Sequence, residues 1–216
     1  MRSATHPFPV LRWCALVWML VWLPAYVHTW GWANLLHLCD VAVFLSAAGV
    51  WLGNRLLLSS QALGCIAPGI FWLVDVGGRL ATGRFPLGGT AYMFDPRYPL
   101  GVRLLSTFHL FLPLLLLYAV RKVGYDRRAF ALQSGIAASL LIVSRFLSAD
   151  LNVNYAYRDP LWHHAWAPAP LHVFLILLAI LGAIYLPTHI ILRLVWSKIP
   201  FAENEKVSER LQAVRG

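Results

Sequence analysis

The chain has 216 residues, of which 59% are hydrophobic and only 12% are charged, and its mean hydropathy is +0.64. A soluble domain carries about a quarter charged residues, so this composition excludes an ordinary soluble domain and indicates a multi-pass membrane protein. The net charge of +9 does not indicate a nucleic-acid partner, because the basic residues stand at the ends of apolar segments rather than on one polar face.

Six apolar segments are each close to the ~20 residues that a helix needs to cross about 30 Å of hydrocarbon. They cover residues 11–27, 33–52, 57–78, 100–120, 129–149 and 170–194. We therefore expect an all-α fold, with one bundle of about six transmembrane helices over residues 1–197 and a polar cytoplasmic tail over 198–216. The first segment follows Arg2, as the apolar core of a signal peptide would. Its end has no small-x-small cleavage site, so we interpret the segment as a retained helix.

The positions of the basic residues predict the orientation of this bundle. With the N-terminus inside, the inner side holds twelve of them: Arg2, Arg12, Arg55, Arg121, Lys122, Arg127, Arg128, Arg193, Lys198, Lys206, Arg210 and Arg215. The outer side holds five: Arg79, Arg84, Arg97, Arg103 and Arg158. This distribution follows the positive-inside rule, so both termini are predicted to be cytoplasmic.

In this topology the polar residues inside the membrane gather in its outer half. At 1.5 Å per residue, Cys39 lies roughly 8–9 Å and His109 roughly 13 Å below the outer ends of their helices. The candidates for binding a substrate at this level are His37, Asp75, Arg79, Arg145, Asn152 and Asn154. A buried ionisable group is costly unless it is paired or faces a wet cavity, so we expect His37, Asp40, Asp75, His109 and Arg145 to converge on a cavity that opens to the outer face.

Pairs that only fix helix packing are the alternative interpretation of these residues. Asp75 and Arg79 are four positions apart, and His37 and Asp40 are three apart, so each pair can meet on one helix. Arg145 does not fit this interpretation easily, because it would need an acid from another helix.

Cys39 also has two interpretations. A lone cysteine in an apolar helix is usually a small packing residue, but it becomes a nucleophile when a neighbouring base removes its proton. His109, from another helix at a similar depth, is a better candidate base than His37, which points to another side of the same helix. A carboxylate, Asp40 or Asp75, would then orient the imidazole.

No disulfide, metal or cofactor is expected. The three cysteines, Cys14, Cys39 and Cys65, all fall inside predicted helices, and the chain has neither a CxxC pair nor the spacing of zinc ligands. Two outer loops, 81–99 and 150–170, are rich in aromatic residues and are interpreted either as an interfacial aromatic belt or as a lid over a substrate.

The segment NLLHLCDVAVFL, residues 34–45, resembles the second-helix motif of a family of bacterial six-helix integral membrane proteins of mostly unknown function. The eukaryotic relatives of that family include an ether-phospholipid acyltransferase. A later family histidine is matched by His109 in STFHLFLP, and an asparagine–tyrosine segment is matched by NVNYAY, with Asn152, Asn154 and Tyr155. The FHLFLP and VGYDRRA segments also resemble uncharacterised bacterial membrane-associated proteins.

This resemblance implies that Cys39 is the nucleophile that accepts an acyl group and that His109 is its partner. It also implies that membrane lipids are the binding partners of the protein. It also implies a location in the bacterial inner membrane. The expected function is a lipid acyl transferase or hydrolase that uses Cys39, His109 and Asp40. The alternative is a membrane protein without enzymatic activity, whose role is structural, lipid-binding or the transport of a small solute. Nothing in the sequence indicates a protein partner.

Overall fold

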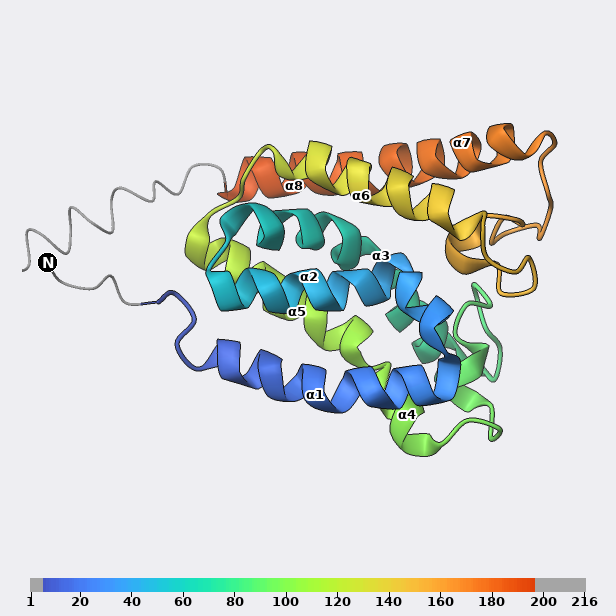
Figure 1. Ribbon diagram of the computed structural model, residues 1–216, viewed down its shortest axis with the longest axis horizontal. Coiled ribbons are helices and arrows are strands. Elements are labelled where there is room, and N and C mark those ends of the chain that lie inside the picture. The colour runs from blue at the N-terminus through green and yellow to red at the C-terminus, as the bar shows by residue number, and fades with distance from the viewer. Residues whose placement is uncertain (1–5, 197–216) are drawn as a thin grey trace, which may run out of the picture.

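The computed structural model describes residues 6–196, and within that range the chain forms helices and loops but no strand (Figure 1). The predicted tail over 198–216 lies outside the described residues. The elements are α1 (Leu11–Trp30), η1 (Trp32–Leu36), α2 (Leu38–Leu52), α3 (Arg55–Thr82), η2 (Ala91–Phe94), α4 (Leu100–Leu105), α5 (Phe108–Val123), α6 (Ala129–Ser144), η3 (Val153–Tyr155), α7 (Ala169–Ala179), the π-helix η4 (Ile180–Tyr185) and α8 (Leu186–Trp196).

The predicted all-helical fold is confirmed, and four helical segments are long and apolar enough to cross a membrane: Leu11–Trp30, Arg55–Thr82, Leu100–Val123 and Ala169–Trp196. The other two predicted spans form the shorter apolar helices α2 and α6, of 15 and 16 residues. At 1.5 Å per residue they reach only about 22–24 Å, less than the hydrocarbon thickness of about 30 Å. At the same end of the bundle, extended backbone at His37 precedes α2 and the 145–168 loop follows α6.

The helical segments run back and forth, so the described chain begins and ends at one end of the bundle (Figure 1). The two long loops, 83–99 and 145–168, lie together at the opposite end. Many large apolar side chains are exposed on the outside of the bundle, including Phe111, Leu114 and Leu178. An apolar surface of this kind suits a helix bundle surrounded by lipid, where hydrocarbon rather than water contacts the side chains.

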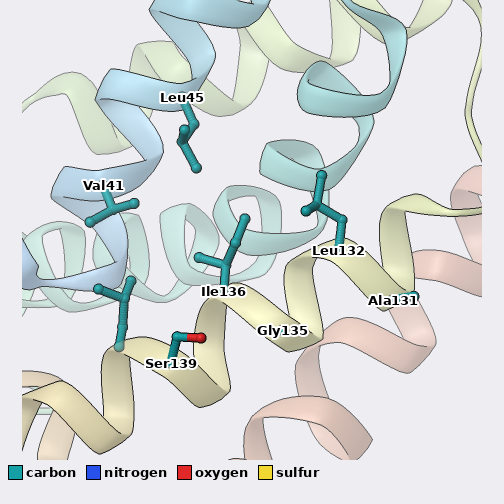
Figure 2. A pocket seen from close by; sticks show the side chains of 8 residues that line it. Val41, Leu45, Ala131, Leu132, Gly135, Ile136 and Ser139 are labelled. Carbon is teal, nitrogen blue, oxygen red and sulfur yellow. The ribbon is translucent and has the colours of Figure 1, made fainter.

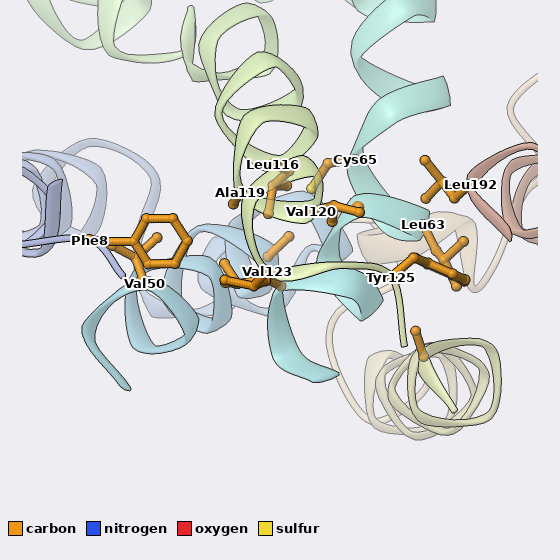
Figure 3. Close-up of a cluster of buried hydrophobic side chains, with 14 residues drawn as sticks. Phe8, Val50, Leu63, Cys65, Leu116, Ala119, Val120, Val123, Tyr125 and Leu192 are labelled. Atoms are coloured by element: carbon orange, nitrogen blue, oxygen red, sulfur yellow. The ribbon is translucent and has the colours of Figure 1, made fainter. Parts of the chain in front are cut away.

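Helix α3 lies at the centre of the bundle and contacts α2, α5 and α6. Near the end that holds both described termini, buried side chains of α3 and α5 pack with Phe8, Val50 and Leu192 (Figure 3). Farther along, α3 and α5 approach so closely at Gly69 that an added Cβ would lie 2.6 Å from the carbonyl oxygen of His109. Only glycine permits this approach, and it brings the backbone of α3 directly against the turn that carries His109.

The π-helix between α7 and α8 precedes Pro187, which has no N–H to donate to the carbonyl of Ala183. Such π-turns occur mostly as short interruptions of α-helices, and Tyr185 in this one is buried in the bundle. The Tyr185 hydroxyl accepts a hydrogen bond from Gln133 at 3.2 Å, and Gln133 in turn accepts one from Gln61 at 3.2 Å. This buried polar link joins α3, α6 and the π-helix, and no sequence pattern predicts it.

Candidate functional site

The predicted helix over 33–52 is interrupted at His37, whose backbone is extended (φ −61°, ψ 140°) between η1 and α2. The side chain of Asn154, far along the chain, bridges this break. Its Oδ1 accepts a hydrogen bond from the Leu38 amide at 2.7 Å, and its Nδ2 donates to the Leu36 carbonyl at 2.8 Å. Backbone groups freed by the break are therefore satisfied by a side chain, which membrane-embedded backbone requires.

Asn154 also donates to Ser144 Oγ at 3.0 Å, so its amide joins the start of α2 to the last residue of α6. Both Asn152 and Asn154 have left-handed backbone conformations, with φ of 42° and 53°, which asparagine adopts more readily than most residues. The Asn152 side chain accepts hydrogen bonds from the amides of Tyr157 and Arg158, each at 3.0 Å. The structure thus places both asparagines in the scaffold of the 145–168 loop.

Asp40 is buried at 2% exposure in the first turn of α2, where the positive end of the helix dipole favours a carboxylate. Its Oδ2 accepts a hydrogen bond from Asn34 at 2.8 Å, and no ion pair to it forms within residues 6–196. The predicted pairing of His37 with Asp40 is therefore wrong, because Asn34 occupies that carboxylate oxygen. The Cys39 thiol lies beside the other oxygen, with Sγ 3.9 Å from Oδ1.

His109, at the start of α5, is oriented by two contacts. Its Nδ1 lies 2.9 Å from the carbonyl of Ser106, which can only accept, so Nδ1 carries the proton and Nε2 is left as an acceptor. The ring stacks on Trp72, with centroids 5.6 Å apart and planes 6° from parallel. Trp72 Nε1 donates to the hydroxyl of Tyr92 at 3.0 Å, and the hydroxyls of Tyr26 and Ser106 lie 2.5 Å apart.

Tyr92, in the 83–99 loop, contacts the group of residues around His109 through Trp72. Burial raises the pKa of Tyr92 to about 12; the hydrogen bond from Trp72 and the Ser106 hydroxyl lower it, and the nearby Cys39 and Asp40 raise it further. The phenol accepts a hydrogen bond from the indole that stacks on His109. Sequence reasoning did not select Tyr92, because an aromatic residue in an outer loop is typical of an interfacial belt.

The 83–99 loop is fastened to the bundle by Asp75, which is only 1% exposed. Its carboxylate accepts hydrogen bonds from the amides of Leu87, Gly88 and Thr90 and from the Thr90 hydroxyl, at 2.7, 3.0, 2.8 and 2.8 Å. The predicted pair of Asp75 with Arg79 is therefore wrong, because loop amides and a hydroxyl take the positions that the guanidinium would need. Asp75 positions the loop that carries Tyr92.

The two predicted arginines also bind the loops next to their own helices. Arg79 lies over the ring of Phe85 at 5.1 Å. Arg145, just after α6, donates to the carbonyl of Ala156 at 3.1 Å and lies over the ring of Tyr157 at 3.9 Å. The acid that Arg145 was expected to need is absent from residues 6–196, because a carbonyl dipole and an aromatic face take its place. Neither arginine joins Asp40 in a charge pair.

The structure thus separates the candidates into two groups. Cys39, Asp40 and His109 lie in the loop-bearing half of the bundle, where Cys39 packs against the buried cluster that includes Phe108, the neighbour of His109. The remaining candidates hold the loops at that end of the bundle, apart from His37, whose ring makes no hydrogen bond within the described part of the chain. Residues 6–196 contain no group of three or more His, Cys, Asp or Glu side chains that could hold a metal ion.

Comparisons with protein-family models, with curated proteins and with solved structures found no match to the chain.

Proposed function

We propose that the protein is a multi-pass membrane enzyme that transfers or hydrolyses the acyl chains of membrane lipids, with Cys39 as the nucleophile and His109 as its base. One observation carries this proposal. Cys39 packs against the buried cluster that includes Phe108, and the ring of Phe108 lies 4.1 Å from the imidazole of His109, which Ser106 and Trp72 orient. A thiol beside a carboxylate and an oriented imidazole on the neighbouring helix support this proposal.

These groups suit acyl transfer through a covalent intermediate. The Nε2 atom of His109 takes the Cys39 proton, and the thiolate attacks the carbonyl carbon of a lipid ester. The new C–S bond forms as the C–O bond to the lipid breaks, and the imidazolium returns its proton to the departing lipid oxygen. A second hydroxyl, from water or from a lysolipid, then attacks the thioester with His109 again as base, which regenerates the thiol.

Tyr92 has a role in this scheme that follows from its hydrogen bonding. Its oxygen already accepts from Trp72, so its own proton is available to a developing oxyanion. A donor held in place before the reaction stabilises the charged tetrahedral intermediate without further reorganisation, and losing one such donor typically costs about 100- to 1,000-fold in kcat. Asp40, hydrogen-bonded by Asn34, holds the thiol proton until His109 removes it.

The proposal also includes an orientation. The helix ends opposite the site carry Arg12, Arg55, Arg121, Lys122 and Arg193, and the loop 124–128 at that end adds two further arginines. Under the positive-inside rule this end faces the cytoplasm, so the site lies in the outer half of a bacterial inner membrane. Reporter fusions after residues 90, 125 and 160 test the orientation, with outside, inside and outside as the expected results; a cytoplasmic signal at 90 or 160 would contradict it.

The activity is tested with the full-length protein in liposomes that contain a phospholipid with a labelled acyl chain, with and without a lysophospholipid acceptor. The wild type should release or transfer the label, and the Cys39→Ser and His109→Ala variants should not. Cys14→Ser is the matched control, because Cys14 is exposed on α1 and should leave turnover unchanged. A Cys39→Ser protein that is folded and as active as the wild type would refute the proposal.

A role without catalysis is favoured by one contact: the hydrogen-bond partner of the Cys39 thiol is Asp40, while His109 binds the carbonyl of Ser106 in its own turn. A protein of this kind would use the polar site only to fix helix packing, bind a lipid or pass a small solute. In that case no labelled acyl chain is released or transferred, and Cys39→Ser has no effect beyond the effects that His109→Ala also has.

A further inference from the structure

A group of basic side chains lies beside the loop 124–128, at the end of the bundle that holds both described termini (Figure 1). Tyr125 joins this loop to α8, because its hydroxyl lies 2.7 Å from Nδ1 of His189. Arg193 stands four residues after His189, about one turn along the same helix, and Arg127 stands two residues after Tyr125 in the loop. Both guanidiniums act electrostatically on the His189 ring. Two arginines from different elements therefore flank one imidazole.

The buried hydroxyl of Tyr125 determines which nitrogen of His189 carries a proton. Tyr125 is 0% exposed, and Nδ1 is the only partner of its hydroxyl within residues 6–196. Burial and the charge of Asp126 raise the pKa of Tyr125, so the phenol keeps its proton and donates it to Nδ1. The proton of the neutral imidazole is then on Nε2, which has no partner in the described part of the chain. His189 is half-buried rather than enclosed, so Nε2 is available as a donor to a ligand.

No described acid neutralises the two arginines. The carboxylate closest to them in sequence, Asp126, is held by Arg128, whose Nε and Nη2 donate to it at 3.1 and 2.8 Å. Arg127 and Arg193 are both exposed, and neither forms an ion pair within residues 6–196. Guanidinium groups bind phosphate oxygens with paired hydrogen bonds. Two guanidiniums and the Nε2–H of the imidazole are therefore open to one phosphate group.

The surroundings of this cluster indicate that the phosphate belongs to a lipid. On α8, Arg193 is followed and preceded by exposed apolar side chains, among them Ile190, Ile191 and Leu194. In a membrane these side chains contact acyl chains, whereas an arginine at a helix end extends its charge toward the headgroups. An anion beside Arg193 thus lies where hydrocarbon meets headgroups. Under the proposed orientation this is the cytoplasmic leaflet, whose surface carries anionic lipids.

An outer hollow of the bundle, between α2 and α6, does not compete for such an anion. It is lined by apolar side chains such as Leu45 and Ile136, and the Ser139 hydroxyl is the single polar side chain among them (Figure 2). A phosphate there would lose hydration without gaining a cationic partner, which is unfavourable. The anion is therefore expected at the basic end of the bundle.

We propose that Arg127, His189 and Arg193 together bind the phosphate of an anionic phospholipid. This site is independent of the proposed acyl transfer, because it lies at the other end of the bundle from Cys39. A diffuse basic surface, which orients the protein without binding one lipid, is the competing explanation. It accounts for the number of arginines at this end, but it does not require an imidazole with a free donor between two of them.

The test uses the full-length protein in phosphatidylcholine liposomes that contain a small fraction of photoactivatable phosphatidylglycerol or photoactivatable phosphatidylcholine. Cross-links to residues 186–194 should favour phosphatidylglycerol about 25-fold, because each basic residue near an anionic lipid contributes about fivefold. Arg127→Gln combined with Arg193→Gln should remove this preference. His189→Phe combined with Tyr125→Phe removes the Nε2 donor without leaving a buried hydroxyl unpaired, and it should lower the preference about two- to tenfold. An unchanged preference in either double variant would overturn the proposal.

Arg12→Gln combined with Lys122→Gln is the matched control, because it removes the same charge from the same end of the bundle. Arg12 lies over the ring of Trp51 at 5.8 Å and Lys122 over the ring of Phe8 at 5.6 Å, so both are on the side of α1, across the bundle from α8 (Figure 1). The control should keep the preference for phosphatidylglycerol. Equal losses in the control and in the arginine variant would show a diffuse basic surface and overturn the proposal. An excess of inorganic phosphate should leave the cross-links unchanged, and their loss would identify a soluble anion as the ligand and contradict the assignment to a lipid.

Discussion

Replacing Asp75 by asparagine should release the 83–99 loop from the bundle. The two carboxylate oxygens each accept two hydrogen bonds, one from the amides of Leu87 and Gly88 and the other from the amide and hydroxyl of Thr90. Asparagine has nearly the same shape but keeps only one oxygen, so one pair of donors faces an NH2 group. Because hydrogen bonds to a charged group contribute about 1.5–3 kcal/mol each, the loop should lose about 3 kcal/mol or more of docking free energy.

A loss of this size raises the population of the undocked loop by about 100-fold, since 1.4 kcal/mol corresponds to a factor of ten. Hydrogen–deuterium exchange of the peptide that covers residues 84–99 measures it directly. Asp95→Asn is the matched control, because Asp95 lies in the same loop but pairs with an exposed arginine, Arg97, at 2.6 Å. The control should exchange like the wild type. If Asp75→Asn also exchanged like the wild type, Asp75 would not be the anchor of this loop.

Three further results are expected. Asn154→Ala should lower the free energy of unfolding by about 2–4 kcal/mol in thermal denaturation, because backbone groups at the α2 break lose their partner, and equal stability would contradict this. Tyr92→Phe should lower kcat about 100-fold with little change in KM, and an unchanged kcat would remove Tyr92 from the oxyanion role. The pKa of Asp159 is lowered, because burial raises it but the amides of Trp162, His164 and Leu161 lower it more. A carboxyl whose pKa is lowered in the folded state stabilises the loop at pH values above its unfolded-state pKa of about 3.9. It loses that effect as the pH falls through the folded-state pKa. A fluorine label on Trp162 should therefore show loosening only below about pH 4 in the wild type, but already at pH 7 in Asp159→Asn.

The all-helical fold could be predicted because apolar runs of membrane length are a direct property of the sequence. The break at His37 could not, because the residues around it are compatible with a continuous helix. The partner that stabilises the break, Asn154, is more than 100 positions away. The loop-facing role of Asp75 was missed for a related reason: a spacing of four from Arg79 is visible in the sequence, whereas the backbone amides that bind Asp75 have no sequence signal.

The candidate residues were selected by similar logic. Cys39, Asp40 and His109 were selected because reactive side chains stand out in apolar segments, and the structure places all three in one half of the bundle. Tyr92 was missed because its significance depends on the contact with Trp72 and on a loop position that Asp75 determines. Spacing arguments find partners on one helix, but they do not find partners that a loop brings in from outside.

The central claim is that Cys39 carries an acyl group during turnover, and peptide mass spectrometry of the acid-quenched protein tests it most directly. Full-length protein in liposomes is mixed with a phospholipid, quenched with acid within the first turnovers and digested. The peptide that contains Cys39 should gain the mass of one acyl chain less one hydrogen, lose that mass on treatment with hydroxylamine, and gain far less of it in His109→Ala. The same added mass on Cys14 or Cys65, or none on Cys39 while labelled acyl chains are transferred, would contradict the account.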